Sequence, residues 1–274
     1  MRLSYNDLEA GIRALQISSR TPVVVHASLS ALGWVRGGAG ALVDVLHSNF
    51  ECLLMPAFTY KTMLIPEAGP AHNGMVYGTG RDRNRMAVFY YPGMPVDRLI
   101  GAIPEALRTH PGSTRSRHPI LSFTGLGAGP FLERQTLQDP FGPLAALAES
   151  GGWVLLWGVD HTANTSLHIA EQQAGRPAFV RWALTPSGVR RCESFPGCSL
   201  GFGPLAAELA AMTRRTRIGN GWVLALPLRA MIEKAADMIR QRPAGYLCGG
   251  LACSRCREVH RWALGMSLPQ PAAA

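Results

Sequence analysis

The sequence predicts an α/β fold: a single domain with a mostly parallel sheet covered by helices, and a C-terminal helical and hairpin extension. Short apolar segments bounded by glycines, such as Trp153-Val-Leu-Leu-Trp157, are typical of buried strands. They alternate along the chain with segments of helical pattern, as in parallel sheets. With 274 residues, 47% of them hydrophobic, the chain can also build a core.

The first third of the chain is predicted to contain two helices and two strands. We expect helices over 7–15 and 41–50 and buried strands over 21–26 and 52–58. The stretch from Thr59 to Pro95 is rich in Gly and Pro and shows little periodicity. Loops of this length are usually functional or mobile, and tyrosines within it, Tyr60 among them, are candidates for a pocket wall.

The middle of the chain continues the alternation. We expect a helix over 101–108 with proline in its first turn, a strand over 120–123, a helix over 144–149 and the strand 153–157. The next helix is predicted to begin near Asn164, because Asn, Thr and Ser are the residue types that cap helices.

The last third is predicted to hold a hairpin over 178–184 and 188–193, followed by helices over 205–214 and 227–240. A turn at Gly219-Asn220-Gly221 separates the two helices. No repeat or interdomain linker interrupts the sequence, so we expect one domain over 1–265. The tail over 266–274 is expected to be disordered.

The stretch from Gly158 to Glu171 concentrates reactive side chains at a strand-to-helix connection, where α/β proteins bind ligands. His168 and Glu171 are three residues apart and would share one helix face, with Thr165 one turn earlier. The three supply a base, an orienting carboxylate and a hydroxyl donor. Together they can deprotonate an amine or alcohol and stabilise an oxyanion.

Histidines also fall at other predicted element ends. His26 ends the first strand, His118 precedes the strand at 120–123, and His161 lies in the loop before His168. Neutral imidazole accepts protons at pH 7, although a single histidine is more often structural. His26, His161 and His168 together also suit a metal-dependent hydrolase, which we keep as a distant alternative.

A loop of small residues, 27–40, connects the strand ending at His26 to the next helix. Glycine amides beside a helix N-terminus can hold a phosphate. The order of the glycines matches neither the dinucleotide fingerprint nor the P-loop, so turn chemistry alone explains them equally well.

The net charge of +9 comes almost wholly from arginine, since Lys61 and Lys234 are the only lysines. Such a charge suits a phosphate-bearing partner, but codon usage rich in G and C favours arginine as well. No basic-aromatic interleaving accompanies the charge, so we expect no nucleic-acid partner.

The N-terminus lacks the apolar core of a signal peptide, and no apolar run reaches the roughly 18 residues of a membrane span. We therefore expect a soluble cytoplasmic protein without a membrane partner. The six cysteines then fit reduced thiols or a metal site better than disulfides. The oligomeric state stays open, with a homodimer as one candidate.

Cysteines gather near the C-terminus in the pattern Cys248-x4-Cys253-x2-Cys256-x3-His260. Three thiolates and an imidazole can complete a tetrahedral structural zinc site. Cys198 is an alternative fourth ligand to His260, and unligated thiols are the alternative to a metal site.

Four segments resemble, in order and spacing, the aminoglycoside 3-N-acetyltransferase family, and the resemblance covers roughly residues 5 to 250. The family transfers acetyl from acetyl-CoA to an amine of the deoxystreptamine ring, on an α/β fold distinct from that of the GNAT acetyltransferases. The segments are Val23 to Trp34, Leu54 to Thr59, Pro111 to Pro119 and Gly158 to Glu171.

The resemblance implies an acetyl-CoA-dependent N-acetyltransferase of antibiotic resistance, with a small-molecule amine as acceptor. His168 matches the general base, Thr165 the oxyanion donor, and Glu171 and Glu105 acidic positions of the cleft. We include His26 with the catalytic residues. The coenzyme A positions implied by the family are Ser28, Leu32, Gly33, Trp34, Val35, Arg115 and Ser116.

Two departures from the family bear on the acceptor. Relatives often carry Gly-His-Asp where this chain has Asp160-His161-Thr162, and the segment 89–95 lacks an aspartate that relatives often carry. With Tyr60 and Glu105, we therefore assign Asp160 and His161 to the acceptor side. A polycationic aminoglycoside fits a protein of charge +9 poorly, so a same-fold acyltransferase acting on a different amine is the alternative.

Overall fold

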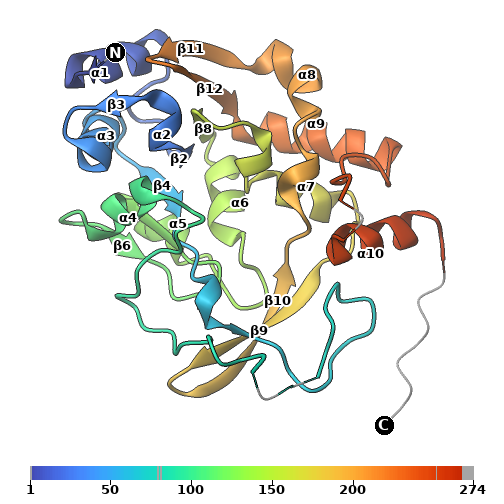
Figure 1. The fold of residues 1–274 in the computed structure, drawn as a ribbon. Coiled ribbons are helices and arrows are strands. Elements are labelled where there is room, and N and C mark those ends of the chain that lie inside the picture. Colours follow the sequence, from blue (N-terminus) through green and yellow to red (C-terminus); the bar gives the residue numbers. More distant parts are fainter. Residues whose placement is uncertain (1, 79, 81, 251, 267–274) are drawn as a thin grey trace.

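The computed structural model describes residues 2–78, 80, 82–250 and 252–266, so the predicted tail lies outside the described residues from 267 onward. A seven-stranded sheet runs through the molecule in the order β11-β12-β8-β2-β4-β7-β6 (Figure 1). Its strands are β2 (Val23–Ala27), β4 (Leu53–Pro56), β6 (Thr114–Arg115), β7 (Phe123–Leu126), β8 (Trp153–Trp157), β11 (Arg214–Ile218) and β12 (Gly221–Pro227).

The predicted α/β class is confirmed, and the sheet is mixed. In this sheet β2 pairs in parallel with both β8 and β4, with Val24 paired to both Val154 and Leu54, while the outer pairings are antiparallel. The parallel part is narrower than expected, because β11 and β12 add an antiparallel hairpin between the two predicted helices, where the sequence indicated only a turn. The arginines of β11 are largely exposed and hide its strand pattern.

Helices cover both faces of the sheet, as the alternation of strands and helices predicts. Val23 and Val25 of β2 point into one apolar cluster and Val24 into the other, because successive strand residues face opposite sides. The first cluster is covered by α1 (Tyr5–Ala14), α3 (Gly38–Asn49) and α4 (Ala102–Thr109), and the second by α6 (Gly142–Glu149), α7 (Leu167–Gln173) and α9 (Leu228–Gln241).

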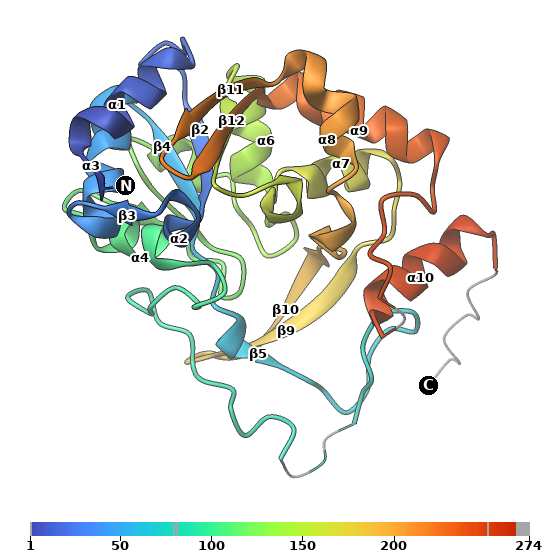
Figure 2. The same ribbon diagram turned by 45° about the horizontal axis from the view of Figure 1, so that its top comes forward.

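A smaller sheet of order β10-β9-β5 lies below the main one in the view of Figure 2. It contains β5 (Met63–Leu64) and the predicted hairpin, which the structure confirms as β9 (Phe179–Thr185) and β10 (Gly188–Phe195). The C-terminal helix α10 (Ser254–Ala263) lies beside the long loop that follows β5, and the Ser254 hydroxyl donates to the Gly74 carbonyl at 2.7 Å.

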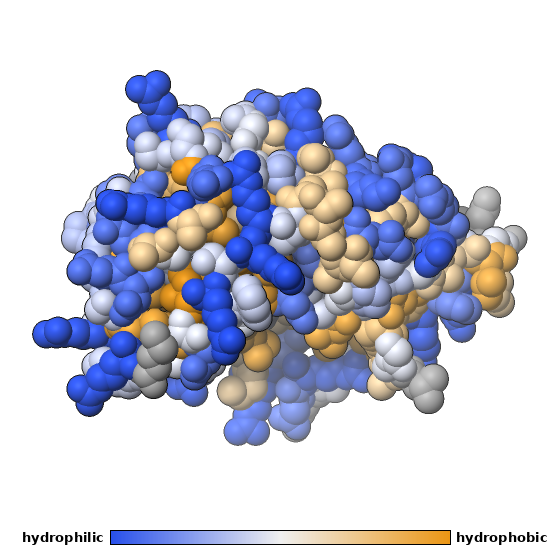
Figure 3. Space-filling view, turned by 90° about the horizontal axis from the view of Figure 1, so that it is seen from above, coloured by the Kyte–Doolittle hydropathy of each residue, from blue (hydrophilic) through white to orange (hydrophobic). Residues whose placement is uncertain are grey.

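Short elements complete the connections. They are β1 (Arg2–Leu3), α2 (Leu29–Leu32), β3 (Trp34–Val35), α5 (Gly129–Leu132) and α8 (Leu205–Leu209). The face seen in Figure 3 is mostly hydrophilic, with smaller hydrophobic patches between the charged side chains. No helix among the described residues is both long and apolar enough to cross a membrane.

Candidate active site

The connection from β8 to α7 begins with a sharp turn at the carboxyl end of β8. Gly158 adopts φ +64°, a left-handed conformation that suits glycine. Asp160 then caps a short 3-10 turn by accepting from the Thr162 amide at 2.8 Å. Helix α7 begins at Leu167, three residues later than expected, because Asn164 accepts from the Ser166 amide and ends the turn first.

Three buried side chains, two from α7 and one that follows it, are linked by hydrogen bonds. His168 Nδ1 lies 2.7 Å from Glu171 Oε2, and Arg176 donates to Glu171 Oε1 at 2.9 Å. Arg176 also donates to the backbone carbonyls of Pro243 and Gly245. The carboxylate can therefore hold the proton on Nδ1 of His168, which leaves Nε2 to act on a ligand.

Aromatic rings fix the plane of the His168 imidazole. The Phe141 ring stacks on it with centroids 5.9 Å apart and planes 23° apart, and Phe202 lies 5.2 Å away on a tilted plane. Burial tends to raise the pKa of the Glu171 carboxyl. The hydrogen bonds and charges of His168 and Arg176 outweigh that effect, so the pKa lies below its ordinary value and the carboxylate stays ionised.

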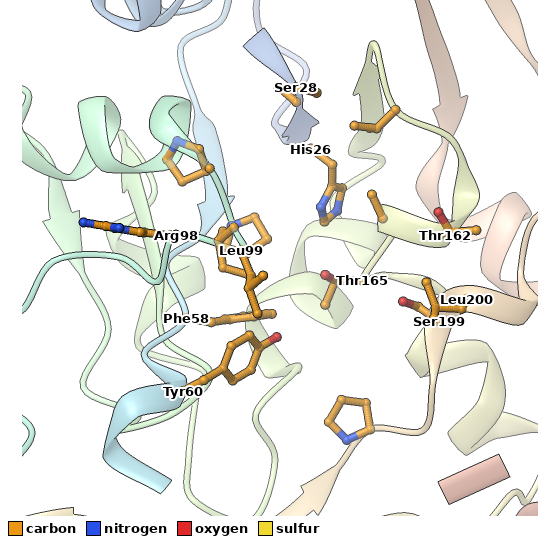
Figure 4. A pocket seen from close by; sticks show the side chains of 18 of the residues that line it. His26, Ser28, Phe58, Tyr60, Arg98, Leu99, Thr162, Thr165, Ser199 and Leu200 are labelled. Carbon is orange, nitrogen blue, oxygen red and sulfur yellow. The ribbon is translucent and has the colours of Figure 1, made fainter. Parts of the chain in front are cut away.

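A cavity of about 1270 Å³ opens in front of His168. It is larger than a typical pocket for one drug-sized ligand, which leaves room for two substrates. His168 and Thr165 line it, and Figure 4 shows Thr165 across the cavity from Phe58 and Tyr60. In the same view His26 lies between Ser28 and Thr165, so the structure brings three of the four predicted catalytic residues to one cavity, with Glu171 bonded to His168 behind it.

His26 is buried at the carboxyl end of β2, and its Nε2 has no hydrogen-bond partner among the described residues. Burial, together with the nearby His168, lowers the pKa of His26 to about 3. The ring is therefore neutral at physiological pH and leaves a nitrogen at the cavity that can hydrogen-bond to a ligand.

The residues expected to receive coenzyme A divide into two groups. Ser28 and Gly33 line the cavity. Leu32 and Val35 are buried in the core, and Trp34 is exposed on β3 with the Arg2 guanidinium 4.7 Å from its ring centroid.

Arg115 and Ser116 do not line the cavity. Arg115 donates to the backbone of the 92–94 loop and to the Ala57 carbonyl after β4. Ser116 accepts from the Phe123 amide at 2.8 Å and donates to Gln135. Both residues hold loops in place near the end of the sheet.

On the expected acceptor side, Tyr60 lines the cavity, and burial raises the pKa of its hydroxyl to about 12. Glu105 instead pairs with Arg108 and accepts from the Val96 amide at 2.9 Å, which fastens the loop before α4. Asp160 faces a second cavity of about 620 Å³ that it shares with Thr162, and His161 is buried beneath the turn.

The structure brings three of the four predicted metal ligands together, with Cys198 beside them in place of His260. The Sγ atoms of Cys198, Cys248, Cys253 and Cys256 all lie within 4.8 Å of one another, while His260 is exposed one turn further along α10. A zinc–sulfur distance of about 2.3 Å allows four thiolates at such spacing. Cys198, the alternative ligand, therefore joins the three thiols at the start of α10, and Cys198 also lines the main cavity.

Among the described residues, these four cysteines are the group of His, Cys, Asp and Glu with ligand atoms close enough to hold a metal ion. His26, His161 and His168 do not form such a group, so the metal-dependent hydrolase finds no ligand set. Sequence patterns missed Arg176, because it follows Glu171 beyond the end of α7 and carries no motif spacing.

A buried carboxylate–imidazole pair beside a large cavity, on an α/β sheet, is an arrangement that can accept a proton from a bound ligand. The family model for aminoglycoside 3-N-acetyltransferase matches residues 24–240, more than half of the chain. The chain belongs to this family.

Individual proteins of the family are also similar in sequence to this chain. The chain is 34% identical over 175 residues to aminoglycoside N(3)-acetyltransferase VIII of Streptomyces fradiae, covering 61% of this chain and 59% of the relative. It is 33% identical to the prophage-derived acetyltransferase-like protein YokD of Bacillus subtilis, covering 58% and 61%. The chain thus spans about three fifths of the length of the curated relatives it matches.

Solved structures share the fold. The YokD structure superposes with a TM-score of 0.76 at 22% identity, covering 88% of this chain and 95% of that one. The binary complex of AAC-IIIb with CoASH gives 0.74 at 25% identity, covering 88% and 98%. The structure of AAC-VIa bound to sisomicin gives 0.71 at 21% identity, covering 88% and 99%.

Proposed function

We propose that the protein is an acetyl-CoA-dependent N-acetyltransferase that transfers the acetyl group directly to an amine, with His168 as general base. The observation that carries the proposal is the 2.7 Å contact between His168 Nδ1 and Glu171 Oε2 beside a cavity that accommodates two substrates. Family membership supports the same chemistry, and a relative binds CoASH.

The mechanism follows from the positions of the side chains. His168 Nε2 takes a proton from the acceptor nitrogen as that nitrogen attacks the thioester carbon. The Thr165 hydroxyl donates to the oxyanion that develops on the carbonyl, and Glu171, held by Arg176, stabilises the imidazolium. The carbon–sulfur bond then breaks and the coenzyme A thiolate leaves. The proton on His168 Nε2 can then pass to the thiolate sulfur. No covalent enzyme intermediate is needed.

The family makes the 3-amino group of a 2-deoxystreptamine aminoglycoside the first acceptor to test, which would make the protein an antibiotic-resistance enzyme. Acetyl-CoA with gentamicin or apramycin should release free thiol above the amine-free rate, with one acetyl group added at that amine. The proposal fails if no primary amine of any class raises the rate of thiol release.

A specific observation favours a second acceptor class. The described residues that line the main cavity include Arg98, Arg181 and Arg255 but no aspartate or glutamate. Polycations bind where carboxylates gather, so this lining suits an amine other than an aminoglycoside. A panel containing both classes separates the two acceptors by their kcat/KM.

We also propose a structural zinc ion bound by Cys198, Cys248, Cys253 and Cys256. Four cysteine thiolates are a frequent zinc ligand set, and the sulfur spacing suits tetrahedral coordination. The ion would fasten the start of α10 to the loop that carries Cys198 along the cavity wall. It would take no part in the transfer, because His168, Thr165 and Glu171 supply that chemistry.

Metal analysis tests the zinc proposal. We expect about one zinc per chain in the purified protein, its loss in Cys198→Ser, and its retention in His260→Ala, which serves as the matched control. Zinc retained in Cys198→Ser and lost in His260→Ala would show that His260, and not Cys198, is the fourth ligand.

We further propose a cytoplasmic location, which is where acetyl-CoA is available to such an enzyme. A homodimer and the absence of a nucleic-acid partner stay predictions. Sedimentation of the purified protein and its retention on DNA at low and high salt test them.

A further inference from the structure

Two arginines line the part of the main cavity that the small sheet and α10 form. Arg181 of β9 and Arg255 of α10 both line the cavity, and both guanidinium groups pack against Phe195, with Cζ 4.8 Å and 5.7 Å from its ring centroid. Burial raises the pKa of the Tyr60 hydroxyl, and the positive charge of Arg255 opposes that rise. In Figure 4, Tyr60 lies across the cavity from Ser28, which belongs to the expected coenzyme A loop.

The two guanidinium groups are held by backbone carbonyls. Arg181 donates through one nitrogen to the Asn73 and Val180 carbonyls, and Arg255 donates through one nitrogen to the Pro196 and Gly197 carbonyls. Among the described residues, no carboxylate forms an ion pair with either of them. Each guanidinium has five N–H donors, so donors remain for a ligand.

Such an arrangement is costly without an anion. Arg181 is only 6% exposed, and like charges close together in a poorly solvated place repel. Burial and the neighbouring Arg255 lower the pKa of Arg181 to about 10, yet it stays charged at physiological pH. Planar guanidinium groups match carboxylate and phosphate oxygens in geometry as well as charge.

The arginines are connected to the reacting end of the cavity through one loop. Arg255 donates to Gly197, and a side chain at Gly197 would meet the Glu171 carboxylate at 3.1 Å. An anion bound at the arginines would therefore lie in the same cavity as His168.

We propose that Arg181 and Arg255 form an anion site for the acceptor, which is then a primary amine that also carries a carboxylate or phosphate group. The inference rests on the proposed acyl transfer and names the acceptor class of the same cavity. Within the cavity, the acceptor nitrogen faces His168 and the anion faces the arginine pair. The site selects against polycations because they bring positive charge to positive charge.

Matched amine pairs test the site through thiol release from acetyl-CoA. We compare 4-aminobutyrate with 4-aminobutanamide, and O-phosphoethanolamine with ethanolamine, beside gentamicin as the polycation. The anionic member of at least one pair should have the higher kcat/KM, by about 10- to 100-fold, the range expected for hydrogen bonds to a charged group. The pair that shows the preference identifies carboxylate or phosphate as the anion.

Substitutions of the arginines test whether the preference for the anionic amine depends on Arg181 and Arg255. Arg181→Gln and Arg255→Gln should each reduce it about tenfold or more, while Arg255→Lys retains part of it. Arg190→Gln, an exposed arginine on the neighbouring strand, should leave it unchanged. Equal rates for the anionic and neutral members, or a kcat/KM for gentamicin that exceeds both, would overturn the proposal.

Binding measurements keep this result separate from the proposed transfer. The dissociation constant of coenzyme A should stay within about threefold of wild type in both variants, whereas a tenfold loss assigns the arginines to the phosphates of coenzyme A and overturns the acceptor site. Inorganic phosphate or succinate should stabilise the CoA-saturated wild type against heat, but not Arg181→Gln. If no amine is acetylated while this anion effect persists, the transfer fails and the anion site stands.

Discussion

At the scale of single residues, the site depends on which nitrogen of each histidine is occupied. Glu171 holds Nδ1 of His168, whereas Nδ1 of His118 accepts from the Ile120 and Leu121 amides at 3.1 Å and 3.0 Å. The same type of side chain is thus the proposed base in one place and an acceptor for backbone amides in the other. Its partners decide the role, and sequence alone does not show them.

The buried His118 makes the fold sensitive to acid. Burial lowers the pKa of its ring to about 4, below the value of about 6.5 in an unfolded chain. Its contribution is therefore complete above about pH 6.5 and is lost as the pH falls toward 4. We expect His118→Asn, which keeps an acceptor for the amides, to reduce the fall in unfolding free energy between pH 7 and pH 5 by about 2 kcal/mol.

Urea unfolding at both pH values measures this difference. The wild type serves as the reference. An unchanged slope in His118→Asn would show that other groups govern acid stability.

At the scale of elements, the turn after β8 sets the shape of the cavity. Gly158 has φ +64°, and a Cβ there would lie 2.7 Å from the Ala31 Cβ and 3.2 Å from the Ser28 carbonyl oxygen. Helix α2 can therefore pack against the turn after β8, with Ser28 at the cavity, only because this residue is glycine.

Gly158→Ala should lower the unfolding free energy by about 1–3 kcal/mol, from backbone strain and displacement of α2. It should also weaken coenzyme A binding, since Ser28 moves with α2. Gly40→Ala within α3, where an added Cβ meets nothing within 4 Å, should instead raise stability by about 0.5–1 kcal/mol. Equal stability of the two variants in urea unfolding would contradict this account of the turn.

Elements with strong apolar patterns could be predicted from sequence. The strand Trp153–Trp157 was expected at those residues, and helix α9 was placed within one residue at each end. The hairpin of β11 and β12 could not, because exposed arginines interrupt its alternation and only the turn at 219–221 stands out. Tertiary pairing with β8 supplies the strand conformation that local sequence does not indicate.

At the scale of the whole molecule, the cavity joins segments that lie far apart in sequence. The loop after His26, the start of α7, the small sheet and α10 each contribute a wall. Motif resemblance predicted the first two, because the catalytic residues keep their spacing. Arg181 and Arg255 carried no motif, so only their convergence in the folded chain indicates an anion site.

The zinc proposal also belongs at this scale, because it concerns how α10 is attached. His72 lies 2.8 Å from Glu258 and Ser254 donates to Gly74, so α10 also holds the long loop after β5. Chelation should lower the midpoint of thermal unfolding and expose this loop to protease, while coenzyme A still binds. An unaltered midpoint after complete metal removal would argue against a structural role.

The most direct test of the central claim is the turnover rate of His168→Ala with acetyl-CoA and the best amine found. A general base usually contributes about 10²–10⁴-fold, so kcat should fall within that range while coenzyme A binding, which reports the fold, stays near wild type. Glu171→Gln should lower kcat in the same direction, because it leaves the imidazolium without its carboxylate. A kcat for His168→Ala within about tenfold of wild type would contradict the assignment of His168 as the base.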